Sequence, residues 1–205
     1  MKTILTIDFD IIMEPSIRIY NSLVNGQIYL ENLPENNLLQ FAKADLNIYR
    51  KITSYLLKIC KNTEIIFIEN HDQVLDFLED DEKYDIINID HHHDLGYGEK
   101  QINPKEDEDY NCANWVLMTY DKNVLNSYKW IRNNNSILPK EDNRCPYTDQ
   151  IIDTTTLSEL PQPDKIILCY SAQWVPQTYR PLFMTWVDLL SDYTGQTLNI
   201  ERGNY

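Results

Sequence analysis

The stretch "YDIINIDHHHD", residues 84–94, joins a short apolar run to a dense group of ionisable side chains. Its first six residues are rich in isoleucine and predict a buried strand. Three of the four histidines in the chain follow directly, between Asp90 and Asp94. Clustered histidine and aspartate have little structural use at the end of a strand, so we interpret this segment as part of a functional site.

Two other predicted strands end in the same kinds of residue. The run "KTILTID", residues 2–8, leads into Asp8 and Asp10, and "TEIIFIEN", residues 63–70, leads into His71. Ligands of parallel sheets bind beyond the carboxyl ends of the strands, which meet at one edge. We therefore expect the three segments to converge.

The remaining pattern alternates short apolar strands with amphipathic stretches, which predicts an α/β domain around a mainly parallel sheet. No interdomain linker is evident, so the prediction is one domain over residues 1–205. Helices are expected at 35–62, 71–81, 112–121 and 177–195, and further strands at 83–90, 126–132 and 163–172. Irregular structure is expected at 11–34, 97–110 and 133–150.

Composition narrows the class of partner. The net charge of −14 and the pI near 4.6 disfavour nucleic acid and favour cationic partners or metal ions. Four scattered cysteines lack the CxxC spacing of a zinc site and fit a reducing cytoplasm. Asp8 and Asp10 interrupt the N-terminal apolar run, and no run reaches the ~20 residues needed to cross a bilayer. We expect a cytoplasmic protein without a membrane partner.

The triple-histidine segment can present alternate residues to one centre. In an extended chain, Asp90, His92 and Asp94 point the same way, while His91 and His93 point away. Asp8 and Asp10 have the same alternate spacing, and His71 adds a nitrogen donor. The complete set is four carboxylates and two imidazoles.

This donor set suits divalent ions of intermediate hardness, above all Mn²⁺, with Fe²⁺, Co²⁺ or Zn²⁺ as alternatives. Six ligands fit two ions ~3.5–4 Å apart, bridged by carboxylates. Without cations, the clustered carboxylates would repel one another and take up protons. A DxD at a strand end is commonly a helix cap, and a lone histidine is commonly structural. Their coincidence at three strand ends favours metal.

Two alternatives stay open. Phosphoesterases of the DHH class also combine an early DxD with a strand-end DHH, which would be Asp90, His91 and His92 here. That class has a histidine where this chain has Thr6, and it offers no place for Asp94. The other alternative is a metal-binding interaction protein without catalytic turnover.

The segments "DFD", "ENHD" and "DHHHD" resemble the metal motifs of arginase-type ureohydrolases, although "DFD" comes first in this chain. With "NCANW" and the short length, the chain more closely resembles the UPF0489-like group. That group includes the peptide arginases, which convert arginine side chains of ribosomally made precursor peptides to ornithine and urea. The resemblance implies a three-layer αβα domain, two Mn²⁺ ions and hydrolysis of a guanidinium C–N bond by a hydroxide held between the ions.

The resemblance also implies roles for individual residues. One ion would be held by His71, Asp90, Asp94 and Asp8, and the other by Asp90, His92, Asp8 and Asp10. Asp94 would move the proton of the attacking hydroxide. Candidate substrate-binding residues are Asn111, Asn114 and Gln173. Trp115 is a candidate either for the pocket or for the helix core.

The chain departs from the arginase pattern in two respects. No histidine follows His93 to act as a proton shuttle. At the late strand where arginases place a guanidinium-binding carboxylate, the nearest candidate is Gln173, which carries no charge. Glu69, beside the histidine of "ENHD", is the candidate catalytic carboxylate for that task.

Overall fold

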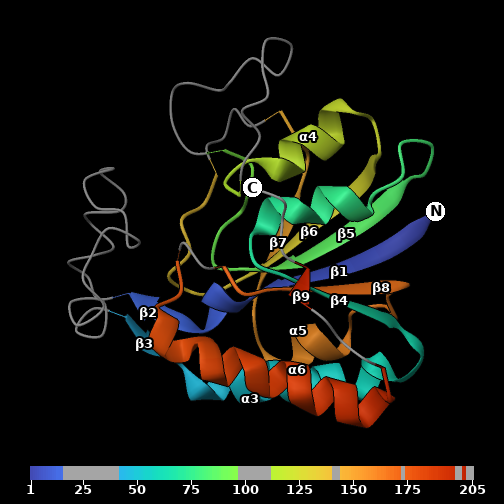
Figure 1. The fold of residues 1–205 in the computed structure, drawn as a ribbon. Helices are drawn as coiled ribbons and strands as arrows, with labels where there is room; N and C mark the ends of the chain where they lie inside the picture. The colour runs from blue at the N-terminus through green and yellow to red at the C-terminus, as the bar shows by residue number, and fades with distance from the viewer. Residues whose placement is uncertain (16–41, 97–111, 140–143, 172–173, 197–199, 202–205) are drawn as a thin grey trace.

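The computed structural model describes residues 1–15, 42–96, 112–139, 144–171, 174–196 and 200–201, and the rest is drawn as a grey trace in Figure 1. Within the described residues, seven strands form one sheet in the order β7-β6-β5-β1-β8-β4-β9, and every neighbouring pair is parallel. The strands are β1 (Lys2–Asp8), β4 (Glu64–Ile68), β5 (Tyr84–Ile89), β6 (Leu125–Arg132), β7 (Thr148–Ile151), β8 (Lys165–Cys169) and β9 (Ile200–Glu201). The predicted α/β class and mainly parallel sheet are confirmed.

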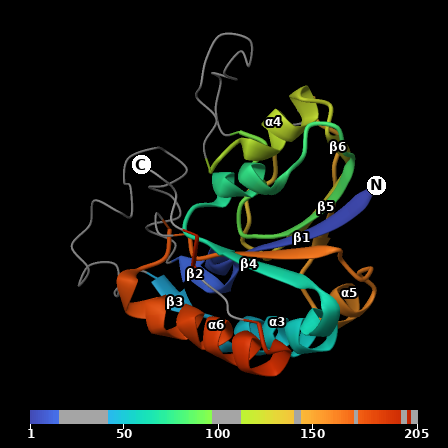
Figure 2. The same ribbon diagram turned by 45° about the vertical axis from the view of Figure 1, so that its right-hand side comes forward.

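Helices cover both faces of the sheet (Figure 1 and, from a second side, Figure 2). One face packs against α3 (Leu46–Ile59), α5 (Thr154–Ser158) and α6 (Arg180–Thr194), and the other against α4 (Trp115–Asp121) and the 3₁₀ helix η4 (His71–Phe77). These three layers explain why the central strands are apolar without alternation, since side chains on both faces are buried. Leu5 of β1 points into the α3 layer, and Ile4 points into the α4 layer.

Two central strands carry a buried polar residue near their carboxyl ends. Thr6 of β1 and Asn88 of β5 are fully buried, and the strand register pairs them directly. Both share the strand parity of Ile4 and Ile86, which pack in the α4 layer. A buried polar group needs a hydrogen-bond partner, so these two positions mark the point along the strands where the purely apolar core ends.

The long helix starts later than the sequence pattern predicts. Helix α3 begins at Leu46 rather than within 35–41, which lie outside the described residues. Asp45 is its N-cap and accepts hydrogen bonds from the backbone N–H groups of Asn47 and Ile48. The preceding strand β3 (Ala42–Ala44) pairs antiparallel with β2 (Met13–Pro15). The cap and this pairing explain why residues 42–45 are not helical.

Other predicted elements are confirmed with shifted ends or corrected. The expected irregular segment 133–150 contains the start of β7, an edge strand whose four residues are all exposed and therefore show no apolar pattern. The short helix expected at 71–81 is the 3₁₀ helix η4. Helix α6 ends at Thr194 and is capped by Gly195, whose φ of 70° is the left-handed conformation that glycine adopts without strain. No helix in the described ranges has the length and apolar composition to span a membrane.

Replacing Asp45 by alanine tests the α3 cap. The substitution removes the acceptor of two backbone N–H groups, so we expect the free energy of unfolding to fall by about 1 kcal/mol. Urea unfolding monitored by circular dichroism measures the change. Asp80→Ala is the control, because Asp80 is highly exposed and its ion pair with Lys122 is 3.9 Å long. Equal stability of the two variants would show that Asp45 does not determine the helix start.

Candidate metal centre

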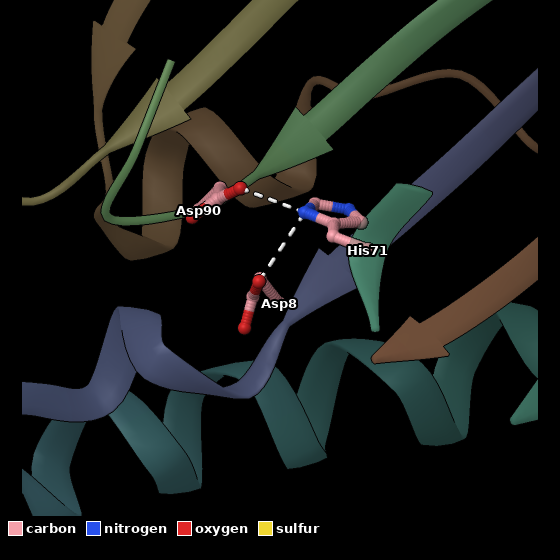
Figure 3. A group of neighbouring side chains, drawn as sticks. All are labelled: Asp8, His71 and Asp90. Carbon is pink, nitrogen blue, oxygen red and sulfur yellow. Dashed lines mark ion pairs between the residues drawn. The ribbon is translucent and has the colours of Figure 1, made fainter. Parts of the chain in front are cut away.

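Three segments from the carboxyl edge of the sheet meet at one place. Asp8 ends β1, Asp90 follows β5, and His71 begins η4 after β4. Strands β1 and β5 are neighbours, whereas β8 lies between β1 and β4. Figure 3 shows that the three side chains nevertheless point toward one another. The predicted convergence is therefore present, although β4 does not adjoin β1.

His71 is the centre of the first group of candidate ligands. Its Nδ1 lies 3.2 Å from Asp8 Oδ2, 3.0 Å from Asp90 Oδ2 and 3.0 Å from Asp94 Oδ2. All four side chains are at most 4% exposed. Nδ1 forms no hydrogen bond to any residue that the structure describes, although three oxygens surround it. An imidazole nitrogen surrounded by three carboxylate oxygens resembles a set of ligands around one metal ion.

His92 is the nitrogen donor of the second group. Its Nδ1 lies 2.6 Å from Asp10 Oδ2 and 3.9 Å from Asp90 Oδ1. Asp90 thus presents Oδ2 to the first histidine and Oδ1 to the second, and both groups of candidate ligands contain it. The 20% exposure of His92 makes it the most accessible of these side chains.

A contact with Thr6 supports the interpretation of His71 as a metal ligand. The Thr6 Oγ1 lies 2.7 Å from His71 Nε2. In the tautomer whose Nε2–H donates to Thr6, Nδ1 presents its lone pair to three carboxylate oxygens. Lone pairs from four atoms cannot face one another at this distance unless a cation or a proton lies between them. A divalent cation fits there, and so does a proton. Burial alone would lower the pKa of His71, but the neighbouring carboxylates of Asp8, Asp90 and Asp94 raise it well above its ordinary value.

Further hydrogen bonds orient the carboxylates. Asn88 Nδ2 donates to Asp90 Oδ2 at 3.1 Å, and the backbone N–H of His92 donates to Asp90 Oδ1 at 2.8 Å. The backbone N–H of Asp10 donates to Asp8 Oδ1 at 3.0 Å. Both oxygens of Asp90 and one oxygen of Asp8 therefore accept hydrogen bonds. These bonds fix the orientation of the two carboxylates before any ion binds.

Burial and charge repulsion shift the pKa values of the cluster. Burial, helped by the neighbouring Asp90 carboxylate, raises the pKa of Asp94 to about 8. Burial also raises the pKa of Asp10 well above its ordinary range, with the Asp8 charge adding to the effect. Burial alone would lower the pKa of His92, but the Asp10 and Asp90 carboxylates outweigh it and raise that pKa to about 10. Without cations, the cluster therefore retains protons.

The other two histidines of the segment have different surroundings. Burial lowers the pKa values of both His91 and His93 to about 3, so both rings are neutral. His93 Nδ1 accepts a hydrogen bond from the backbone N–H of Leu95 at 3.0 Å, and its ring packs edge-on against Trp130. Neither histidine belongs to the two groups of candidate ligands found among the described residues.

Glu69 pairs with a cation of the same chain. Its carboxylate holds the Arg180 guanidinium with both oxygens, and one of these contacts, Oε2 to Nη1, measures 3.0 Å. The Arg180 guanidinium carbon also lies 4.8 Å from the centre of the Tyr170 ring. Glu69 is therefore at the end of β4, as expected, but binding a substrate guanidinium would require it to release Arg180.

The predicted substrate-binding residues are only partly described. Asn114 is buried and is the N-cap of α4, and its carbonyl accepts from Leu117 N–H at 3.0 Å. Asn111 and Gln173 lie outside the described residues. The roles of all three in substrate binding stay predictions.

Sequence reasoning missed several residues that orient the site. Thr6 and Asn88 had a detectable signal, because each interrupts an apolar strand. Trp115 Nε1 donates to Asp94 Oδ2 at 2.6 Å, and Trp130 Nε1 donates to the Asp90 carbonyl at 3.0 Å. These indoles come from α4 and β6. Trp115 was already a candidate for the pocket or the helix core, whereas no spacing in the sequence indicates that Trp130 reaches the cluster.

Comparison with protein-family models finds no match, and neither the search of curated proteins nor that of solved structures finds a similar protein.

The two groups predict a metal stoichiometry that depends on each histidine separately. We expect the unmodified chain to bind two Mn²⁺ ions, and His71→Ala or His92→Ala to lose at least one of them, because each ring is the sole imidazole in its group. Metal analysis after removal of loose ions measures the ratio. His91→Gln is the matched control, since its side chain belongs to neither group. Two ions bound to His92→Ala would contradict the assignment.

Proposed function

We propose that this chain is a binuclear Mn²⁺-dependent hydrolase of the arginase type that acts on arginine side chains of a ribosomally made precursor peptide. In the net reaction, water adds to the guanidinium carbon and its bond to the side-chain nitrogen breaks, giving ornithine and urea. One observation carries the proposal. Asp90 places one oxygen near His71 Nδ1 and the other near His92 Nδ1, and a further carboxylate lies beside each ring.

The residues present fit a pair of ions. The first ion would be held by His71, Asp8, Asp90 and Asp94, and the second by His92, Asp10 and Asp90. Participation of Asp8 in the second site follows only from the resemblance to arginases. When bound, the cations would supply Lewis acidity, which lowers the pKa of water and stabilises developing negative charge.

The chain's own side chains would orient the ligands and move protons. Asp94 is almost fully buried, so a proton that it accepts from the attacking water stays near the cluster rather than passing to bulk solvent. Proton return from Asp94 would convert the departing side-chain nitrogen to the ornithine amine. Thr6 and Asn88 would hold their partner ligands in place without touching the substrate.

The charge of the chain supports a cationic substrate. Its net charge of −14 produces a field that attracts a guanidinium group. A cytoplasmic location belongs to the same proposal, and it is supported by four cysteines that form no disulfide.

The arrangement supports the arginase type over the DHH phosphoesterase type. The phosphoesterase assignment needs His91 as a ligand, but that side chain is absent from the two groups of candidate ligands. It also leaves His71 and Asp94 unexplained, although their atoms lie 3.0 Å apart inside the cluster. The non-catalytic alternative is favoured by one observation, which is that Glu69 already holds Arg180.

The proposed activity is tested by incubating purified chain and Mn²⁺ with synthetic arginine-containing peptides. We expect urea in solution and the loss of one CH₂N₂ unit from the peptide mass, and we expect His92→Ala to abolish both. His91→Gln should retain the activity of the unmodified chain.

The other outcomes separate the alternatives. Release of phosphate from nucleotide or pyrophosphate substrates, without urea, would replace the proposal with a phosphoesterase. Two bound ions with turnover of neither substrate class would identify a metal-binding interaction protein.

A further inference from the structure

The indole of Trp115 forms a short hydrogen bond to one of the candidate ligands. Its Nε1 donates to Asp94 Oδ2 at 2.6 Å, and its ring centre lies 5.1 Å from that of His71. Trp115 is the first residue of α4 and is fully buried. The same ring therefore touches the central histidine of the first group and binds one of its carboxylates.

The backbone around Asp94 is also held toward α4. Asp94 has a φ of 52°, which is uncommon for a residue with a side chain and indicates that surrounding contacts impose the conformation. Two residues later, the backbone N–H of Gly96 donates to the Ala113 carbonyl at 2.9 Å. Tyr128 OH donates to the His93 carbonyl at 2.9 Å. The loop and the start of α4 thus form one connected unit.

The chemistry of the indole makes its hydrogen bond directional. Indole N–H is a donor and has no acceptor atom, so Asp94 must present an oxygen lone pair to it. Hydrogen bonds to carboxylates are short and about twice as strong as neutral ones. The oxygen that Trp115 binds, Oδ2, is the one that lies 3.0 Å from His71 Nδ1. The indole accordingly determines where this ligand atom sits relative to the imidazole.

We propose that Trp115 is a positioning residue that sets the affinity of the His71-centred site for a divalent cation by fixing Asp94 Oδ2. The inference rests on the metal binding in the proposed function and is independent of the substrate. Trp115 acts through Asp94, and the packing of its ring among apolar residues of the α4 layer is a separate, structural contribution.

The chain offers a closely matched control for this role. Trp186 is also fully buried, and its Nε1 donates to Thr53 Oγ1 at 2.8 Å, but it packs in the α3 and α6 layer on the other face of the sheet. Phenylalanine at either position removes an indole N–H and the same side-chain volume. Only at position 115 does the lost hydrogen bond belong to a candidate ligand.

The experiment compares Mn²⁺ binding to the unmodified chain, Trp115→Phe and Trp186→Phe by the electron paramagnetic resonance signal of free Mn²⁺. We expect Trp115→Phe to weaken one of the two sites by about 10- to 100-fold, the usual effect of losing a residue that orients a ligand. Trp186→Phe should leave both sites unchanged. Equal binding by all three proteins would overturn the proposal.

An isosteric analogue separates positioning from packing even if Trp115→Phe fails to fold. Benzothienylalanine at position 115 keeps the ring shape and replaces only the N–H with sulfur, and we expect the same loss of affinity. An affinity equal to that of the unmodified chain would show that the N–H has no such role.

A double-mutant cycle identifies the path of the effect. In an Asp94→Ala background, we expect the benzothienylalanine replacement to cause no further loss, because the side chain that accepts the indole N–H is gone. An undiminished loss in that background would overturn the route through Asp94. Two tight ions in the unmodified chain without urea production would sink the arginase activity alone, whereas absence of Mn²⁺ binding would overturn both proposals.

Discussion

Mutual repulsion among buried carboxylates is the constraint that the rest of the structure must satisfy. Asp8, Asp10, Asp90 and Asp94 are each almost completely shielded from water, and their charges cannot coexist there without positive charge between them. In the absence of an ion, the imidazoles of His71 and His92 hold protons to supply that charge. A cation at either place would remove the repulsion and release the protons at the same time.

The parallel sheet makes this crowding possible. Each ligand-bearing segment leaves a strand at the same edge, so the loops need no long excursion to meet. The exception is His71, which follows β4 and must reach past β8, and the turn into η4 directs it back to the centre. Two polar side chains within the strands then contact the ligands. Thr6 hydrogen-bonds with His71, and Asn88 donates to Asp90.

The sequence was informative where a residue's role depends on its own strand. The apolar runs identified five of the seven strands that the described residues contribute to the main sheet, and the charged groups at three strand ends predicted which segments would meet at its carboxyl edge. The edge strand β7 was missed because exposed residues carry no apolar pattern, and the start of α3 was misplaced because the Asp45 cap competes with helical spacing. The contacts of Trp115 and the Arg180 partner of Glu69 depend on how distant segments pack, which periodicity does not encode.

The unequal exposure of the six candidate ligands has a consequence for access. Five of them are at most 4% exposed, whereas His92 is 20% exposed and has the Trp174 ring 4.6 Å from its own. Within the described part of the chain, the cluster is therefore most open to solvent on the side of His92 and Trp174.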